Sequence, residues 1–183
     1  MDKLVYLITS NPKKLLAAKE VFDKNGICVK QMRSTIHEIQ ADNSMEIAHF
    51  AAVEMHKKTG FTVIREDHSL YLDGLNFPGP YTNYFNRSIP VLKFVKLLNA
   101  LNIKSGRMEV SAVLAGKGII KQFSFNVPLD FSLVPKGNLA KGWDKVMMLK
   151  GESRTFAEYS EDERLTVWQK NFEDISKFIL SKK

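Results

Sequence analysis

The chain has 183 residues, and its 27 lysines and arginines outnumber its 20 aspartates and glutamates by a formal net charge of +7. With 44% hydrophobic residues, the composition is that of a globular protein and not of a disordered chain. The length suits one domain, residues 1–183, made of two lobes that share one core. A single cysteine excludes an internal disulfide framework and a multi-cysteine zinc site.

No apolar run reaches the roughly 18 residues that a membrane span needs. The segment MDKLVYLITS has no long apolar stretch that ends in small residues, so we expect no secretory signal. We therefore expect a cytoplasmic protein with no membrane partner. The positive charge favours anionic partners such as nucleotides or nucleic acids. Because the positive residues are spread along the chain without a base-stacking motif, we expect no stable nucleic-acid partner.

The first elements in chain order are a buried strand over residues 5–8, a polar loop and a helix. Asn11 can cap that helix, and Pro12 suits its first position. Apolar residues then recur at helical spacing as far as Phe22, and Asn25-Gly26 ends the helix.

The loop between this strand and this helix, Thr9-Ser10-Asn11-Pro12-Lys13-Lys14, is a candidate phosphate site. The positive end of a helix binds anions, and the loop adds neutral donors and two lysines. It lacks the glycines of a Walker loop. The alternative interpretation is a simple helix cap with two surface lysines.

A second strand is predicted over 28–32, followed by a polar loop from Ser34 to Asn43. Asn43 and Glu46 resemble a capping pair for a helix over 44–58, which ends before Gly60.

The next strand is predicted over 61–65, with Glu66-Asp67-His68 at its end. Adjacent carboxylates there could hold Mg²⁺, with Glu38 of the preceding loop as a third ligand. The alternative is a solvated acidic turn. His68 is of interest because it adjoins Asp67.

In the second half of the chain, the prolines and glycine over 77–81 predict a rigid turn. A helix is predicted from Pro90 to Leu101, buried around much of its circumference. A β-hairpin follows it. The hairpin strands are 108–115 and 119–127, and a short strand follows at 131–134. Ser160 and Glu163 form a capping box for the last helix, which runs to about Ile179. This order predicts an α/β fold with a mixed sheet.

Gly142-Trp143-Asp144 is the third candidate for chemistry. An exposed tryptophan beside a carboxylate could stack on a base and accept its N–H groups. The equally good alternative is a tryptophan that anchors its loop to the core.

Taken together, six segments in order resemble the inosine triphosphate pyrophosphatases, which cleave ITP, dITP and XTP. These segments are TSNPKK (9–14), IHEIQ (36–40), EDHSL (66–70), FPGPY (77–81), GWD (142–144) and RTFAE (154–158). The resemblance covers nearly the whole chain.

The resemblance implies an elongated, two-lobed α/β fold in which helices flank a mixed central sheet, with a cleft between the lobes, and a homodimer. It implies Mg²⁺-dependent hydrolysis of a nucleoside triphosphate to a monophosphate and pyrophosphate. Asp67 and Glu38 would be catalytic, and Glu38, Glu66 and Asp67 would be metal ligands. The expected substrate-binding residues are Thr9, Ser10, Asn11, Lys13, Lys14, His68, Gly142, Trp143, Asp144, Arg164, Gln169 and Lys170.

The chain departs from the family pattern where the base is recognised. Trp168-Gln169-Lys170 stands where the family has an S-H-R triplet, and Arg164 stands where the family has a lysine before that triplet. Lys141 replaces the aromatic residue that precedes the family's G-[YW]-D segment. Because matched donors and acceptors discriminate polar bases, we expect a changed or relaxed base preference. The alternatives are the same reaction on another modified or pyrimidine nucleotide, and a catalytically inactive nucleotide-binding protein.

Overall fold

The computed structural model describes residues 3–33 and 37–182, so Ile36 and the start of the loop predicted from Ser34 lie outside the described residues. The chain forms two compact units. Unit 1 comprises Met1–Asp67, Val110–Phe125 and Leu165–Lys183, and unit 2 comprises His68–Glu109 and Asn126–Arg164. The single domain expected over 1–183 and the cleft between lobes stay predictions. In the described part of the chain, no helix is long and apolar enough to cross a membrane.

The elements that contribute to unit 1 are β1 (Leu4–Ile8), α1 (Pro12–Lys24), β2 (Cys28–Met32), α2 (Ser44–Thr59), α6 (Lys170–Ser181) and parts of β3 (Val63–Leu72), β5 (Ser105–Gly116) and β6 (Ile119–Phe131). Unit 2 holds the remaining parts of these three strands together with β4 (Pro78–Gly79), α3 (Thr82–Ser88), α4 (Val91–Ala100), β7 (Met147–Leu149) and the 3₁₀ turns η1 (Gly142–Lys145) and η2 (Phe156–Glu158). Helix α5 (Glu161–Val167) begins in unit 2 and ends in unit 1.

The strands form a mixed sheet, as the sequence predicts. Its hydrogen-bonded order is β2-β1-β3-β5-β6-β7, and β4 pairs with β3 outside this path. Strand β1 runs parallel to both β2 and β3, whereas β4 and β7 pair antiparallel to their neighbours.

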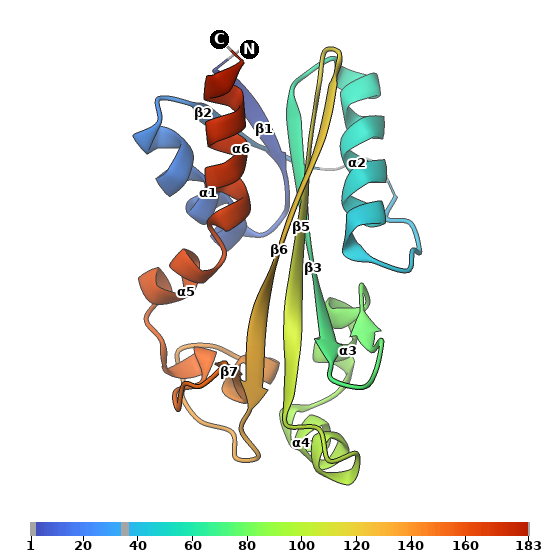
Figure 1. The fold of residues 1–183 in the computed structure, drawn as a ribbon, viewed down its shortest axis with the longest axis vertical. Coiled ribbons are helices and arrows are strands. Elements are labelled where there is room, and N and C mark those ends of the chain that lie inside the picture. The colour runs from blue at the N-terminus through green and yellow to red at the C-terminus, as the bar shows by residue number, and fades with distance from the viewer. Residues whose placement is uncertain (1–2, 34–36, 183) are drawn as a thin grey trace. The chain divides into compact units, whose positions relative to one another are not determined.

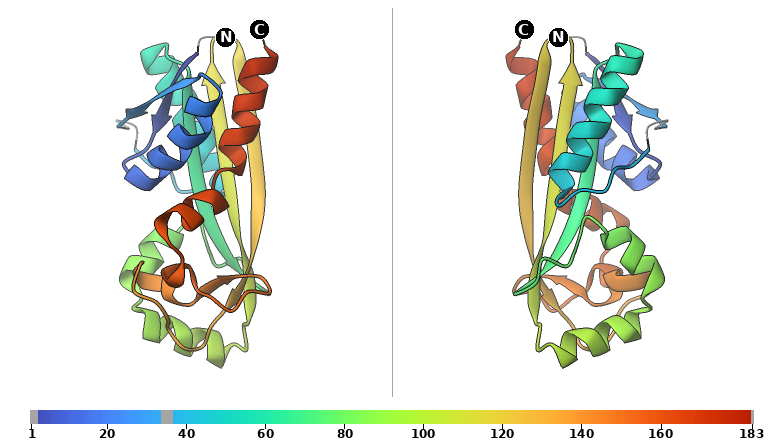
Figure 2. Two further views of the ribbon diagram at one scale, coloured as in Figure 1. Left: turned by 90° about the vertical axis from the view of Figure 1, so that its left-hand side faces the viewer. Right: turned by 90° about the vertical axis from the view of Figure 1, so that its right-hand side faces the viewer.

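Helices cover both faces of the sheet in unit 1. Helices α1 and α6 lie on one face and α2 lies on the other (Figure 1). On the first face, Phe22 and Phe172 pack with Ile64 of β3, and on the second, Ala52 packs with Val63. The two further views in Figure 2 show the same layers. Because β3 is covered on both faces here, any charged side chain in it needs a partner.

The two predicted helix caps are confirmed. Asn11 Oδ1 accepts a hydrogen bond from Lys13 N at 2.9 Å at the start of α1. Asn43 Oδ1 accepts one from Glu46 N at 3.0 Å at the start of α2. Gly60 ends α2 in the left-handed conformation, with φ of 71°.

Four predicted elements differ from the structure in extent, burial or presence. The strand predicted over 61–65 continues to Leu72, and β6 ends at Phe131, so the short strand over 131–134 is absent from the described residues. Helix α4 buries only one side, with Leu92 64% exposed, because unit 2 covers only Phe94 and Leu98. The last helix is broken between α5 and α6 at Trp168-Gln169. The hairpin is confirmed, with both strands longer than predicted.

The predicted capping box at the start of α5 is present. Ser160 N donates to Glu163 Oε2 at 2.8 Å, and Glu163 N donates to Ser160 Oγ at 3.3 Å. The backbone hydrogen bond from Ser160, and after it the bond from Arg154, lowers the pKa of Glu163 below its ordinary value of 4.5.

Replacing Glu163 with alanine should lower the melting temperature at pH 7 by a few degrees, because the carboxylate bonds to Ser160 N and to Arg154 are lost. A lowered carboxyl pKa contributes stability that is present above the unfolded value and is lost as the pH falls through the folded value. The difference from wild type should therefore shrink as the pH drops below about 4.5. Thermal unfolding at several pH values checks this, with Glu161→Ala in the same helical turn as the control. An equal, pH-independent loss in both variants would contradict it.

Candidate active site

The end of β1 determines where the candidate site lies. Ile8 is the last residue of β1 and pairs with Arg65, so the loop that starts at Thr9 begins beside the middle of β3. Glu66 and Asp67 come directly after this pair, within β3 and not at its end as predicted. Glu66 and Asp67 therefore lie just beyond the end of β1, although β3 itself continues to Leu72.

Lys14 connects the polar loop region to β3. Its Nζ donates to Glu66 O at 3.0 Å and lies 3.7 Å from Glu66 Oε2. Burial lowers the pKa of Lys14, while the charges of Glu66 and Asp67 raise it. The side chains of Lys14 and Glu66 are only 19% and 1% exposed. The helix that follows the polar turn and the acidic segment of β3 are thus in direct contact.

The loop residues divide into structural and exposed groups. Thr9 is buried, and its Oγ1 accepts a hydrogen bond from Asn11 N at 3.0 Å, while its carbonyl accepts one from Gln31 Nε2 at 2.9 Å. Ser10, Asn11 and Lys13 are exposed at the positive end of α1. Thr9 therefore shapes the loop, and the exposed residues present polar groups to solvent.

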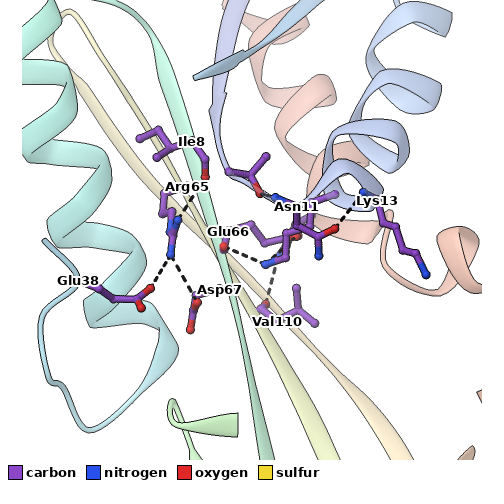
Figure 3. A network of polar contacts seen from close by, with 11 residues as sticks. Ile8, Asn11, Lys13, Glu38, Arg65, Glu66, Asp67 and Val110 are labelled. Atoms are coloured by element: carbon purple, nitrogen blue, oxygen red, sulfur yellow. Dashed lines mark hydrogen bonds and ion pairs between the residues drawn. The ribbon is translucent and has the colours of Figure 1, made fainter. Parts of the chain in front are cut away.

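The other face of β3 carries a second charged group. Side chains alternate along a strand, so Arg65 and Asp67 share the face of Val63, which packs under α2, and Glu66 shares the opposite face with Ile64. Arg65 Nη2 lies 2.7 Å from Glu38 Oε1 and 3.9 Å from Asp67 Oδ1. Figure 3 shows Glu38 and Asp67 reaching the same end of the Arg65 side chain.

Arg65 is the residue that the sequence reasoning missed. Arg65 binds the carboxylate of Glu38, which is 27 residues earlier in the chain. The available signal was a cation at an inward-facing position of an apolar strand, followed at once by two carboxylates. Buried cations in strands require anionic partners, and these two carboxylates supply them.

The predicted set of three metal-ligating carboxylates is not brought together. Within residues 3–33 and 37–182, no group of three or more histidine, cysteine, aspartate or glutamate side chains is arranged to hold a metal ion. Glu66 lies with Lys14 on the opposite face of β3 from Asp67. Glu38 and Asp67 alone converge, at a point that already accommodates positive charge, and their oxygen donors suit a hard divalent cation.

Trp143 is not the exposed base-stacking residue that the sequence analysis considered. It is fully buried in unit 2, where its ring stacks on Phe94 with centroids 3.8 Å apart. Its Nε1 donates to Ile89 O at 3.0 Å, and its backbone N donates to Asn86 Oδ1 at 3.0 Å. The alternative, a tryptophan that anchors the 142–144 loop to the core, is confirmed.

Among the other predicted substrate residues of unit 2, Arg164 has a structural role. Arg164 Nη1 donates to the backbone oxygens of Phe156 at 3.2 Å and Tyr159 at 2.7 Å, which secures the turn before α5. His68 and Asp144 are half-buried. Their roles toward a substrate stay predictions.

Gln169 and Lys170 lie at the start of α6 in unit 1. Gln169 Nε2 donates to Glu20 Oε2 at 2.6 Å and so connects α6 to α1. Lys170 Nζ donates to Asp174 Oδ2 at 2.7 Å, and this bond raises the pKa of Lys170. Both side chains therefore already have partners on α1 or α6. Their part in base recognition stays a prediction.

The chain matches the profile of the Ham1 family over residues 5–171. It is 32% identical over 166 residues to the dITP/XTP pyrophosphatase of Ignicoccus hospitalis, which covers 88% of each chain. It is 33% identical over 159 residues to that of Saccharolobus solfataricus, covering 86% of this chain and 83% of the relative. The fold is similar to that of a HAM1 protein from Coxiella burnetii, with a TM-score of 0.82 at 18% identity over 98% and 99% of the two chains.

Replacing Lys14 with methionine should destabilise the protein by about 3 kcal/mol, because the buried Glu66 carboxylate loses its cationic partner. The exposed neighbour Lys13 provides the matched control, and Lys13→Met should change stability by less than about 0.5 kcal/mol. Urea denaturation measures both values. The double variant K14M/E66Q should cost less than the sum of its single variants. Equal stability of K14M and K13M would contradict the structural role of this pair.

Proposed function

Because the chain belongs to the Ham1 family, we propose that it is a nucleoside triphosphate pyrophosphohydrolase that acts on non-standard purine nucleotides such as ITP, dITP and XTP. It would hydrolyse the bond between the α- and β-phosphates to release a monophosphate and pyrophosphate. The observation that supports the proposal most directly is the contact between Lys14 and Glu66, which brings the helix that follows the polar turn against the acidic segment of β3.

The phosphate chain would lie at the N-terminus of α1. Ser10, Asn11 and Lys13 are exposed there, and the helix end adds partial positive charge. A transferring phosphoryl group spreads negative charge over its equatorial oxygens, and positioned cations stabilise that charge. Lys14 is held by Glu66, so it would contribute its charge from a fixed place.

Glu38 and Asp67 would hold the divalent cation, because their carboxylates converge and are hard oxygen ligands. A bound cation would neutralise charge on the phosphate oxygens. Asp67, which is anchored in β3, would orient the attacking water and accept its proton. Glu66 supports the site from the opposite face through Lys14 and is not a ligand in this proposal.

The finer features of the proposal come from the resemblance. The ion would be Mg²⁺, the assembly a homodimer and the compartment the cytoplasm, with residues 1–183 as one domain. Gln169 and Lys170 stand where the family has its purine-reading histidine and arginine, and both have partners within unit 1. We therefore expect a base preference that is changed or relaxed relative to ordinary members.

Replacing Asp67 with asparagine should reduce pyrophosphate release by at least about a hundredfold, because a neutral amide binds a divalent cation weakly and accepts no proton. Exposed Asp42, changed to asparagine, is the matched control and should leave the rate unchanged. The assay is pyrophosphate release with Mg²⁺ from ITP, dITP, XTP and the four standard triphosphates.

Retained activity in D67N would overturn the catalytic role of Asp67. A preference for ITP and XTP as strong as in ordinary members would overturn the altered base preference alone. Binding of triphosphates by calorimetry, without release of pyrophosphate from any of them, would identify an inactive nucleotide-binding protein instead.

A further inference from the structure

We propose that Arg65 is a built-in competitor of the divalent cation. Its guanidinium holds the Glu38 and Asp67 carboxylates together in the metal-free protein and has to leave them when a cation binds. This inference rests on the proposed function, because these two carboxylates are the proposed metal ligands.

The distances place the guanidinium where the cation would be. One nitrogen, Arg65 Nη2, is the atom that both carboxylates approach, at 2.7 Å from Glu38 Oε1 and 3.9 Å from Asp67 Oδ1 (Figure 3). Mg²⁺ requires oxygen ligands at about 2.1 Å. A cation bound to these same two oxygens would take the place of this nitrogen, so the guanidinium and the cation exclude each other there.

Charge repulsion strengthens this exclusion. The side chains of Arg65 and Asp67 are only 18% and 17% exposed, so solvent screens their interactions weakly. A divalent ion at Asp67 would repel the guanidinium at short range. Glu38, at 66% exposure, is the partner best able to move as the contact changes.

The remaining bonds of Arg65 are weak ones. Its Nη1 donates to Ile8 O at 3.4 Å, close to the limit of a hydrogen bond. Its Nε is buried and has no hydrogen-bond partner among the described residues. The two carboxylates therefore provide most of the stabilisation of the guanidinium. When a cation binds both of them, the guanidinium loses the interactions that hold it in place.

Replacing Arg65 with methionine, which keeps much of the volume and removes the charge, should tighten Mg²⁺ binding on the order of tenfold. Isothermal calorimetry of nucleotide-free protein with magnesium chloride gives the dissociation constants. Lys57→Met on α2 removes one charge from an exposed pair with Glu54 and should leave the constant within about twofold of wild type. Arg65→Lys should stay close to wild type, because it keeps a competing cation.

Equal or weaker Mg²⁺ binding by R65M than by wild type would overturn the proposal. If R65M does not fold, the wild-type protein with ¹⁵N-labelled arginine provides the test by NMR. The Arg65 side-chain signal, assigned with R65K, should shift and saturate at the Mg²⁺ concentration at which calorimetry shows binding, and the Arg154 signal should not. An unchanged Arg65 signal at saturating Mg²⁺ would overturn the proposal.

The experiment separates this inference from the proposed function. If wild type and R65M bind Mg²⁺ equally and both release pyrophosphate, only the competition by Arg65 is wrong. If neither protein binds Mg²⁺ and neither releases pyrophosphate, the metal site of the proposed function is wrong, and the inference is overturned with it.

Discussion

The bond between Lys14 and Glu66 is the contact on which the rest of the candidate site depends. Each group is costly to bury alone, since desolvation disfavours an ammonium and a carboxylate alike. Burial lowers the pKa of Lys14, and the nearby carboxylates favour its charged form. The bond fixes the first turn of α1 against the middle of β3.

The strand arrangement explains why two charged groups with different properties meet at β3. Alternation places Glu66 on the α1 face and Arg65 with Asp67 on the α2 face. The first face holds a closed pair whose partners are both largely buried. The second holds an arginine between two carboxylates, one of which is mostly exposed. The structural pair and the proposed cation-binding carboxylates therefore lie on opposite faces of the same strand.

Local signals in the sequence predicted much of the architecture of unit 1. Asn11 and Asn43 act through atoms two or three residues away, so their capping roles can be inferred without any knowledge of the fold. In unit 2, the same holds for Ser160 and Glu163. The length of β3 could not be predicted in this way, because the buried Glu66 in mid-strand has its cationic partner, Lys14, on another element.

The errors in the site have the same origin. The local sequence around Trp143 is equally compatible with an exposed and a buried side chain. The ring is buried because it stacks on Phe94, which is 49 positions earlier in the chain. Arg65 acquires its importance from a glutamate in a distant loop. The residue pattern grouped Glu38, Glu66 and Asp67 as one possible ligand set, and only the alternation of β3 separates Glu66 from the other two.

A crystal structure with Mn²⁺ and a non-hydrolysable triphosphate is the most direct test of this account. We expect the anomalous signal of the metal between the Glu38 and Asp67 carboxylates, with the phosphates at the start of α1 and Arg65 withdrawn from both carboxylates. A metal bound elsewhere, or a triphosphate that contacts neither Lys13 nor the start of α1, would contradict it.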